Sequence, residues 1–497
     1  MFKQWSWFSA PVQPQVCLGT RGPFGLFSLT LPLSDLRTHL YVVGASGTGK
    51  SKYLEHLLIH LVTAGYGCGV IDPHSDLAND LIAHLASYPK HRPWLADPTN
   101  RQRVVYLDPA RTDSVVPVNL LKRTGASPYA IAENIVEAFK RVWPDTVGDG
   151  RAPRFAEILR NALLVLAVRG LTLLELAPFL TQSAYRTQLL TNFPDEQVAA
   201  FFTTQYDRWG REQVLMAAPV LNKVSAFLFQ PAVRLSLGAA ENRLDWRRIM
   251  DGYQVLIVDL GGLTGETQQL YGSLLVTSLE HAALSRREQA AKQRRPFVCM
   301  IDEFANFVTR DAGTLARILS EVRKFNVYLG LAHQTIAQTE GRVQGALENA
   351  LLKVVFATGR QTAEVLAPAL FRPQPDAVKH MVEDIAAQAR SHPLFEALPT
   401  QLEMAVQQIL RLKRRQVLVQ LPEAARVVEL TTPTVPPARL SGGRLARLKR
   451  LLAGQVGYLP QEIERQIARR RQSTAAPRAS TEQEPGAWQE ALWQPYA

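Results

Sequence analysis

The chain has 497 residues, 46% of them hydrophobic, which excludes a short peptide or a disordered chain and indicates a globular protein of about two to four structural units. Its net charge of +12 and pI of about 9.7 favour a polyanionic partner, either nucleic acid or an acidic membrane surface. Three cysteines without metal-ligand spacing exclude a disulfide framework and indicate reduced thiols.

Residues 1–36 are predicted to form an N-terminal segment with partial β structure, ahead of the first buried strand. That strand, 39–44, leads into a glycine-rich turn and then into a helical pattern. The turn fits G-x-x-x-x-G-K-[ST] at every defined position. Its members are Gly44, Ala45, Ser46, Gly47, Thr48, Gly49, Lys50 and Ser51.

This turn is typical of a phosphate-binding loop. Its glycines let successive backbone N–H groups point inward around an anion, and the N-terminus of the following helix adds a favourable dipole. Lys50 is expected to reach the terminal phosphates of ATP, and the Ser51 hydroxyl to ligate Mg²⁺. The strand before the turn and the helix predicted over 52–63 are the context that the pattern requires.

Short apolar runs rich in Val, Ile and Leu recur through residues 37–139 and 249–432. They lack polar alternation, which is typical of parallel strands covered by helices on both faces. The prediction is one α/β domain with a mostly parallel sheet, formed from both parts of the chain. The predicted strands are 39–44, 68–72, 104–108, 255–259, 297–302, 327–332, 353–357 and 417–421.

Acidic residues end two of the early strands. Asp72 and Asp108 each precede a proline, which stops the strand. Two interpretations stay open for Asp72, His74 and Asp76, namely support of the local loop structure and support of the nucleotide site. None of the three is expected to be catalytic.

Residues 140–248 differ from the sequence on either side. Helical periodicity is clear over 154–168 and 214–229, and no strand pattern accompanies it. This stretch is predicted to be an all-α domain inserted into the α/β domain.

The second motif lies at the end of the predicted strand 297–302, where five apolar residues run into Asp302 and Glu303. A carboxylate at the tip of a buried strand beside the phosphate loop is suited to the Mg²⁺ shell, so Asp302 is predicted to bind the metal. Glu303 is predicted to orient and polarise the attacking water. GTP-binding switches usually lack the second carboxylate, so the pair indicates ATP hydrolysis.

The third motif surrounds the strand 327–332. Gln334 follows its carboxyl end, where parallel sheets bind ligands, and is predicted to contact the γ-phosphate or the water. His333 is interpreted equally as a packed histidine or as a sensor. Arg323, before the strand, is either a favourable cation at a helix C-terminus or an arginine supplied to the ATP of a neighbouring subunit.

Residues 433–497 are predicted to be a basic helical segment followed by a disordered tail. After a Pro/Gly-rich break, residues 439–471 carry nine lysines and arginines against two glutamates. This segment suits nucleic acid or an acidic membrane, and a solvated surface helix is the alternative. Trp488 and Trp493 in the polar tail are candidate anchors for a partner.

The chain resembles the type IV secretion coupling ATPases, the TraG/TraD-like, TraM-recognition branch of the HerA/FtsK superfamily, over roughly residues 20–432. The resemblance rests on segments that occur in order along the chain. They are RTHLYVVGASGTGKS, GVIDPHSDL, VVYLDP, PVNLL, MIDEFANF, RKFNVYLGLAHQ and LENALLKVVFATG.

This resemblance implies a RecA-like P-loop domain, a hexameric ring, and a helical domain that faces the relaxosome or the secretion substrate. It implies that ATP hydrolysis with Mg²⁺ drives single-stranded DNA, often with a bound protein, toward a secretion channel. The site residues that it implies are Lys50 and Ser51 for phosphate and Mg²⁺, Asp302 and Glu303 as the Walker B pair, Gln334 as the sensor, and Arg323 as an arginine finger acting across the subunit interface.

One departure from the family concerns the membrane. Membrane coupling proteins carry N-terminal transmembrane helices, whereas no stretch of this sequence has the roughly 20 mostly apolar residues that a span needs. We therefore expect the chain in the cytoplasm, held at the inner membrane only through a partner. Two alternatives stay open: a soluble HerA-like DNA translocase in DNA processing or defence, with a nuclease partner, and a non-motor ATPase switch that controls assembly by binding.

Overall fold

The computed structural model divides into two compact units. The first comprises Met1–Val105, Arg247–Gly261 and Ala283–Arg447, and the second Tyr106–Trp246, Gly262–Ala282 and Leu448–Ala497. The limits 140–248 for an inserted helical domain stay a prediction. The structure describes residues 15–22, 25–32, 38–87, 93–122, 125–143, 153–307, 318–335, 350–371, 378–384, 390–421 and 427–475.

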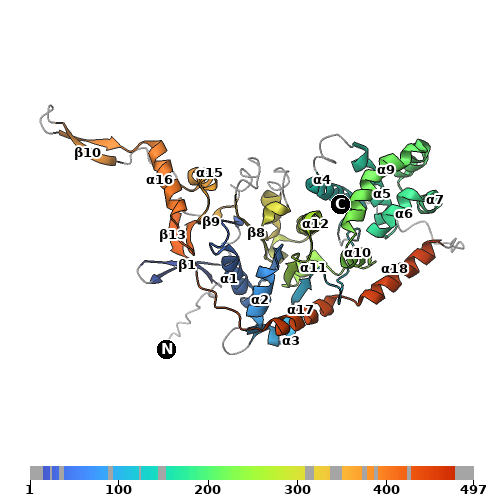
Figure 1. Ribbon diagram of the computed structural model, residues 1–497, viewed down its shortest axis with the longest axis horizontal. Helices are drawn as coiled ribbons and strands as arrows, with labels where there is room; N and C mark the ends of the chain where they lie inside the picture. Colours follow the sequence, from blue (N-terminus) through green and yellow to red (C-terminus); the bar gives the residue numbers. More distant parts are fainter. Residues whose placement is uncertain are drawn as a thin grey trace, which may run out of the picture. The chain divides into compact units, whose positions relative to one another are not determined.

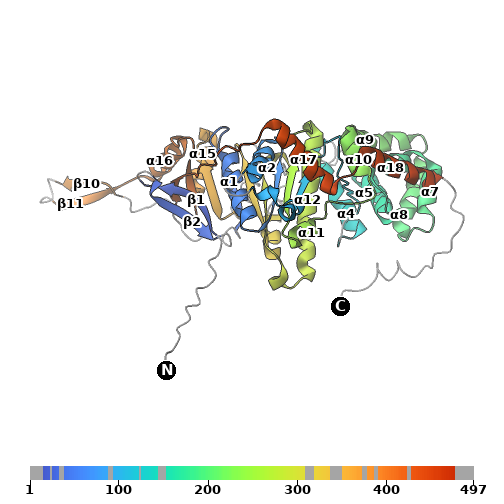
Figure 2. The same ribbon diagram turned by 90° about the horizontal axis from the view of Figure 1, so that it is seen from below.

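An 11-stranded sheet is the main feature of the fold, with the strand order β2-β1-β13-β12-β9-β3-β8-β7-β4-β6-β5. A separate pair, β10 and β11, forms a hairpin that projects from the first unit (Figure 2). In chain order the strands are β1 Gln15–Arg21, β2 Phe27–Pro32, β3 Leu40–Val43, β4 Gly67–Asp72, β5 Val104–Leu107, β6 Val255–Asp259, β7 Phe297–Ile301, β8 Val327–His333, β9 Leu352–Phe356, β10 Val378–Asp384, β11 Arg390–Phe395, β12 Gln416–Gln420 and β13 Val427–Thr431.

Every apolar run that predicts a strand forms one, so this part of the prediction is confirmed. In the middle of the sheet, β3 pairs in parallel with β8 and β9, β7 with β4 and β8, and β4 with β6. All residues of β3, β4, β6, β7 and β8 are buried, which explains why these runs carry no polar alternation. Antiparallel strands β12, β13, β1 and β2 extend one edge.

Helices follow the strands as the periodicity predicts. They are α1 Lys50–Thr63, α2 Asp76–Ser87, α3 Pro98–Gln102, α4 Pro128–Val142, α5 Pro153–Val168, α6 Leu176–Thr181, α7 Ser183–Leu190, α8 Glu196–Ala200, α9 Glu212–Phe227, α10 Pro231–Gly238, α11 Trp246–Asp251, α12 Gly265–Leu284, α15 Arg360–Leu370, α16 Leu398–Leu410, α17 Gly442–Val456 and α18 Pro460–Ala475.

In the first unit, α1 lies beside α2 and packs on β4 (Figure 1). Its leucines Leu54, Leu57, Leu58 and Leu61 are buried, and their spacing places them on one helix face. The helix α1 that leaves the glycine-rich turn is therefore fixed by an apolar face against the sheet.

The second unit is helical around an aromatic core. Helix α4 packs on α5, and α5 packs on α9. Phe139 and Phe155 lie with ring centroids 6.3 Å apart, and Phe179 meets Phe202 edge to face at 4.8 Å. These rings supply the apolar contacts that the helical periodicity predicted.

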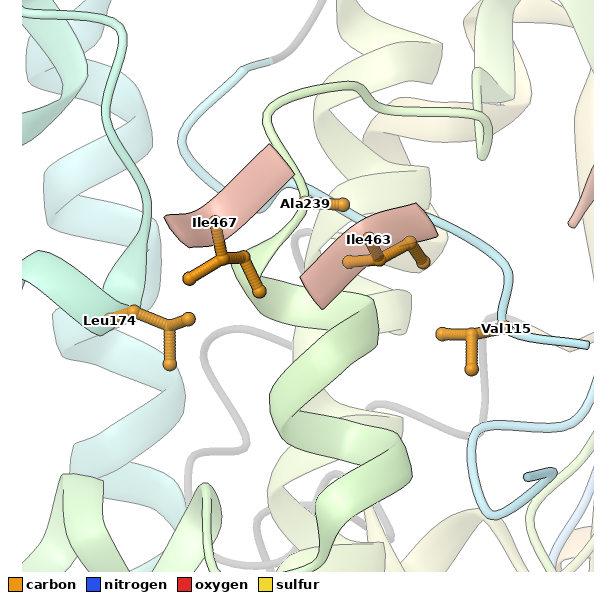
Figure 3. Close-up of a cluster of buried hydrophobic side chains, with 5 residues drawn as sticks. All are labelled: Val115, Leu174, Ala239, Ile463 and Ile467. Atoms are coloured by element: carbon orange, nitrogen blue, oxygen red, sulfur yellow. The ribbon is translucent and has the colours of Figure 1, made fainter. Parts of the chain in front are cut away.

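The basic C-terminal segment forms α17 and α18, and α18 is anchored in the second unit. Ile463 and Ile467 are buried against Leu174, Ala239 and Val115 (Figure 3). The two isoleucines are four residues apart, so they lie on one face of the helix.

One arginine of α18 is also part of this anchor. Arg470 Nε donates to Glu175 Oε1 at 2.9 Å, and its Nη2 donates to the Gly238 carbonyl at 2.8 Å. The segment is thus an amphipathic helix with one packed face, and the binding of nucleic acid or of a membrane by its exposed side chains stays a prediction.

No single helix among the described residues is long and apolar enough to cross a membrane; α9 and α10 meet that test of length and composition only as a pair bent by 107°. The three cysteines are unpaired, as predicted. Trp488 and Trp493 lie outside the described residues, so the proposal of an aromatic anchor in the tail stays a prediction.

Candidate nucleotide-binding site

The glycine-rich turn follows β3, which lies between β9 and β8 in the sheet. Gly47 and Gly49 have φ of 77° and 119°, in the left-handed region that favours glycine. At Gly44 a β-carbon would lie 2.4 Å from the Cβ of Phe356, so a side chain does not fit. Two of the predicted glycines are therefore needed for the turn and one for close packing.

The helix that leaves this turn begins without a side-chain cap. Gly49 is the N-cap of α1, and the first turn carries no acidic residue in this fully described helix. Helices α4 and α8, in contrast, are capped by Ser127 and Asp195. The first N–H groups of α1 thus keep their capacity to bind an anion, at the positive end of the helix dipole.

Lys50 lies buried against the turn and is 6% exposed. Its Nζ donates to the Gly44 carbonyl at 2.6 Å and to the Ala45 carbonyl at 3.4 Å. Burial lowers the pKa of the Lys50 ammonium, while the charges of Glu303 and Asp302 raise it. The ammonium is therefore held beside the loop in which the terminal phosphates of a nucleotide would bind.

Asp302 directly follows β7, and it is close to the helix α1. Ser51 Oγ donates to Asp302 Oδ2 at 3.5 Å, so the first and second motifs meet in space. Burial raises the pKa of the Asp302 carboxyl, and the charge of Glu303 raises it further. A hydroxyl and a carboxylate are hard oxygen ligands of the kind that Mg²⁺ takes, and the remaining positions suit water and phosphate oxygens. The residues therefore fit Mg²⁺.

Glu303 is 5% exposed and has a left-handed backbone, with φ of 46° and ψ of 46°. Its N–H donates to Asp302 Oδ1 at 3.0 Å. A non-glycine residue in this region costs about 1–3 kcal/mol, and such strain is typical of active sites. The turn ends β7 before these two residues. The carboxylates of Asp302 and Glu303 are therefore not placed like successive side chains of a strand, which point to opposite faces of the sheet.

Strand β8 lies between β3 and β7, so its carboxyl end lies between the phosphate loop and Asp302. Gln334, the next residue after β8, is half-buried there. This position is compatible with a contact to the γ-phosphate or the water, and that contact stays a prediction.

His333, the last residue of β8, is fully buried. Its Nε2 is 2.5 Å from the hydroxyl of Tyr41, and its Nδ1 is 2.9 Å from the Thr335 carbonyl. Burial lowers the pKa of His333 to about 4, so the ring is neutral near pH 7. The structure thus favours a packed histidine over a sensor.

Arg323 lies at the amino end of β8, in the 3₁₀ turn Val322–Phe325, where its own side chain is exposed. The seven residues of β8 span about 20 Å at roughly 3.3 Å per residue, and this distance separates Arg323 from Gln334. An arginine side chain does not cover that distance. The placement excludes an arginine finger acting on the ATP of its own chain and leaves the role across a subunit interface open. The sequence before the strand predicts a helix over 314–325, of which residues 314–317 lie outside the described residues.

Asp72 shapes the loop after β4. Its Oδ1 accepts from the His74 N–H at 2.8 Å and its Oδ2 from the Ala78 N–H at 2.9 Å, so it fixes the start of α2. Burial raises its pKa to about 6. These contacts favour the structural interpretation of Asp72.

Asp259 is a strand-end aspartate that the sequence interpretation did not single out. It ends β6, and Ser75 Oγ donates to its Oδ1 at 2.5 Å, so it joins the loop after β4 to the end of β6. The signal that could have found it is an aspartate at the end of an apolar run, the same signal that singled out Asp72 and Asp302.

The strand order, the glycine-rich turn and the paired carboxylates define a RecA-like P-loop fold. The structure is similar to the conjugative coupling protein TrwBdeltaN70, with a TM-score of 0.54, 17% identity, and coverage of 82% of this chain and 87% of that one. TrwB in complex with ADP and Mg²⁺ gives a TM-score of 0.52, 17% identity, and coverage of 82% and 89%. VirB4 of Thermoanaerobacter pseudethanolicus gives 0.50, 13%, and coverage of 85% and 96%.

Neither a protein-family model nor a curated protein matches the sequence. At these identities the likeness to the solved structures establishes the fold. The predicted α/β, RecA-like P-loop fold is confirmed, and at the level of the fold so is the resemblance to coupling ATPases.

Proposed function

We propose that the chain is an Mg²⁺-dependent ATPase motor that moves DNA, alone or with a bound protein, as in conjugative transfer or type IV secretion. The observation that carries the proposal is the 3.5 Å contact between Ser51 and Asp302, which joins the phosphate loop to the end of β7, where Glu303 follows Asp302. Coupling protein TrwB, which has the same fold, is known in complex with ADP and Mg²⁺. The basic charge supports a DNA substrate.

In this proposal each residue has one task. The N–H groups of the loop and the ammonium of Lys50 bind the phosphates, and Ser51 with Asp302 holds Mg²⁺. Mg²⁺, when bound, neutralises charge on the phosphate oxygens. The Glu303 carboxylate accepts a proton from the attacking water, and Gln334 orients that water or the γ-phosphate.

We further propose a homohexameric ring in which Arg323 completes the ATP site of the neighbouring copy. Its exposed side chain has no ion-pair partner among the described residues, and it lies at the amino end of β8, whereas the phosphate loop lies at the carboxyl ends of the parallel strands. We propose single-stranded DNA as the substrate, a cytoplasmic location, and recruitment to the inner membrane by a relaxase or a membrane secretion partner.

The test is ATP turnover measured without DNA, with single-stranded DNA and with double-stranded DNA, together with the mass of the assembly. Stimulation by single-stranded DNA in a six-copy particle is the expected result. Stimulation by double-stranded DNA alone would favour a HerA-like translocase in DNA processing. Equal turnover under all three conditions would favour an ATPase switch and contradict the motor.

The exposed arginines of α18 are expected to contribute to DNA binding. Arg465, Arg469 and Arg471 are exposed, while Ile463 and Ile467 of the same helix are buried. Each phosphate contact with single-stranded DNA contributes about 0.7 to the slope of log affinity against log salt. Replacing all three by Gln should therefore reduce that slope by up to about 2, as measured by DNA-binding titrations at several salt concentrations.

The matched control replaces Glu462 and Glu464, exposed on the same helix, by Gln. This variant should bind DNA more tightly, because it removes repulsion at the same place. Arg470 is left intact since it anchors the helix to Glu175. An unchanged salt slope in the arginine variant would show that α18 presents only a solvated face.

A further inference from the structure

The turn that carries Arg323 is held at every backbone carbonyl from 323 to 326. The Arg323 carbonyl accepts from the Asn326 N–H at 3.1 Å, and the Asn326 carbonyl accepts from the Phe297 N–H at 2.9 Å. The two carbonyls between them accept from arginine side chains. Lys324 O receives Arg294 Nη1 at 2.9 Å, and Phe325 O receives Arg286 Nη1 at 3.0 Å.

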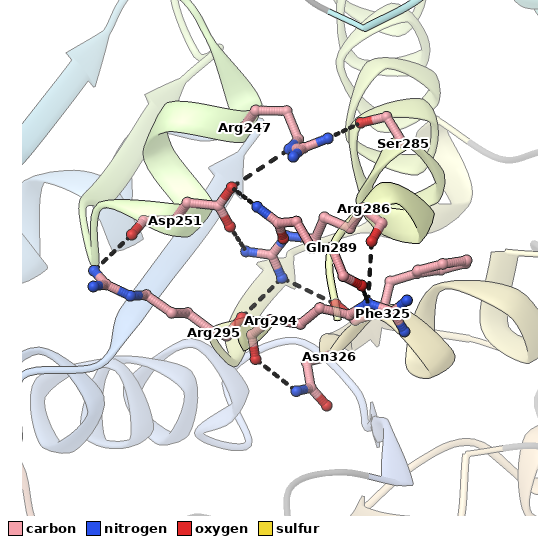
Figure 4. A network of polar contacts seen from close by, with 9 residues as sticks. All are labelled: Arg247, Asp251, Ser285, Arg286, Gln289, Arg294, Arg295, Phe325 and Asn326. Atoms are coloured by element: carbon pink, nitrogen blue, oxygen red, sulfur yellow. Dashed lines mark hydrogen bonds and ion pairs between the residues drawn. The ribbon is translucent and has the colours of Figure 1, made fainter. Parts of the chain in front are cut away.

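Arg286 is the buried centre of this network (Figure 4). Its side chain is 0% exposed, and its Nη2 donates to Asp251 Oδ1 at 2.7 Å. Its Nη1 also donates to the Arg295 carbonyl at 2.8 Å. One guanidinium thus joins the end of α11, the segment before β7 and the turn that carries Arg323.

Arg294 makes a second attachment to the same turn. Its Nε donates to the Arg286 carbonyl at 3.1 Å, and its guanidinium lies 4.9 Å from the centre of the Phe325 ring. In return, Asn326 Nδ2 donates to the Arg294 carbonyl at 2.7 Å. Asn326 has φ of 58°, so this side-chain contact fixes a left-handed residue that ends the turn.

Stability alone does not account for the network. Burial lowers the pKa of Arg286, because removing a guanidinium from water is costly, and the Asp251 carboxylate opposes this. A buried ion pair is often no more stabilising than apolar side chains of similar volume. Here the guanidinium groups of Arg286 and Arg294 donate to the carbonyls of one short turn, which indicates that the position of that turn matters.

We propose that Arg286 and Arg294 are positioning residues that fix the direction in which Arg323 projects toward the ATP of a neighbouring copy. This inference rests on the proposed function of Arg323. A finger acts on a transition state of fixed geometry, and a displacement of about 1 Å can cost about 10²-fold in rate. The hydrogen bonds of Arg286 and Arg294 hold the turn in the fixed position that such a finger requires.

The test compares Arg294→Ala with Arg295→Ala in the full chain with DNA and ATP. Arg294→Ala should lower kcat by about tenfold to about 10²-fold without changing the KM for ATP. Arg295 is the matched control, because it is also paired to this network, through the Asp251 carbonyl at 2.7 Å, and lies 4.3 Å from the Tyr253 ring, yet its side chain does not touch the turn. Arg295→Ala should keep the normal kcat.

The decisive readout is a double-mutant cycle with Arg323→Ala. If Arg294 acts through Arg323, Arg294→Ala should have no further effect once Arg323 is gone. An equal loss of kcat in both backgrounds, or an equal loss in Arg295→Ala, would show a merely structural role and overturn the proposal. A normal kcat in Arg323→Ala alone would instead reject the proposed finger.

Two further variants cover the case in which Arg294→Ala folds poorly. Arg294→Lys keeps one donor for the Lys324 carbonyl and should recover part of kcat. Asn326→Gly keeps a residue suited to the left-handed φ but loses the side-chain contacts with the Arg294 carbonyl and the Tyr328 hydroxyl, so kcat should fall. Normal turnover in Asn326→Gly together with no recovery in Arg294→Lys would overturn the proposal.

Discussion

Replacing Glu303 by Gln should lower ATP turnover by about 10²–10⁴-fold while leaving ATP affinity nearly unchanged. The reason is its position. Glu303 follows Asp302 on a strained left-handed turn, and in the proposed mechanism it acts on water and makes no contact with the nucleotide. Glutamine keeps the size and the backbone of the residue but does not accept the proton. Turnover is measured by phosphate release, and affinity by titration with a fluorescent nucleotide.

Lys50→Ala is the matched comparison, because it should weaken ATP binding itself. The Lys50 ammonium lies at the loop, 2.6 Å from the Gly44 carbonyl, where it would meet the phosphates. The two variants therefore separate binding from hydrolysis. Normal turnover in Glu303→Gln would remove the residue from the proposed mechanism, and a loss of ATP affinity equal to that of Lys50→Ala would show that it supports binding.

The central strands and the phosphate loop could be predicted because both depend on neighbouring residues in the sequence. A run such as 68–72 is apolar throughout since both faces of β4 are covered. The glycines of the loop are determined by backbone geometry, with Gly49 at φ of 119°. Asp302 and Glu303 could be singled out because strand ends are visible in the hydrophobic pattern.

Contacts between distant residues were not predictable in the same way. Arg286 is 35 positions from Asp251, and nothing in its local sequence distinguishes a buried guanidinium from an exposed one. The anchoring of α18 was partly visible, since Ile463 and Ile467 stand four apart in a charged segment. The charge of that segment favoured a solvent-facing interpretation, and the apolar spacing decided how the helix packs.

Arg323→Ala is expected to remove most of the turnover, because an arginine finger contributes about 10³–10⁵-fold where it acts. In the proposed ring the finger of one copy serves the site of the next. Rings of Arg323→Ala subunits and rings of Lys50→Ala subunits should each be nearly inactive. Rings that contain both should recover activity, because some interfaces join an intact site to an intact finger.

The control for this mixing experiment is a chain that carries both substitutions. Mixed with Arg323→Ala subunits, it offers no intact finger at any interface, so no recovery is expected. The structure gives the reason for expecting action in trans. The seven residues of β8, about 20 Å of strand, separate Arg323 from the end of the sheet where its own chain binds phosphate. If mixed rings that contain both chains remain inactive, Arg323 does not act across the subunit interface and its role is structural.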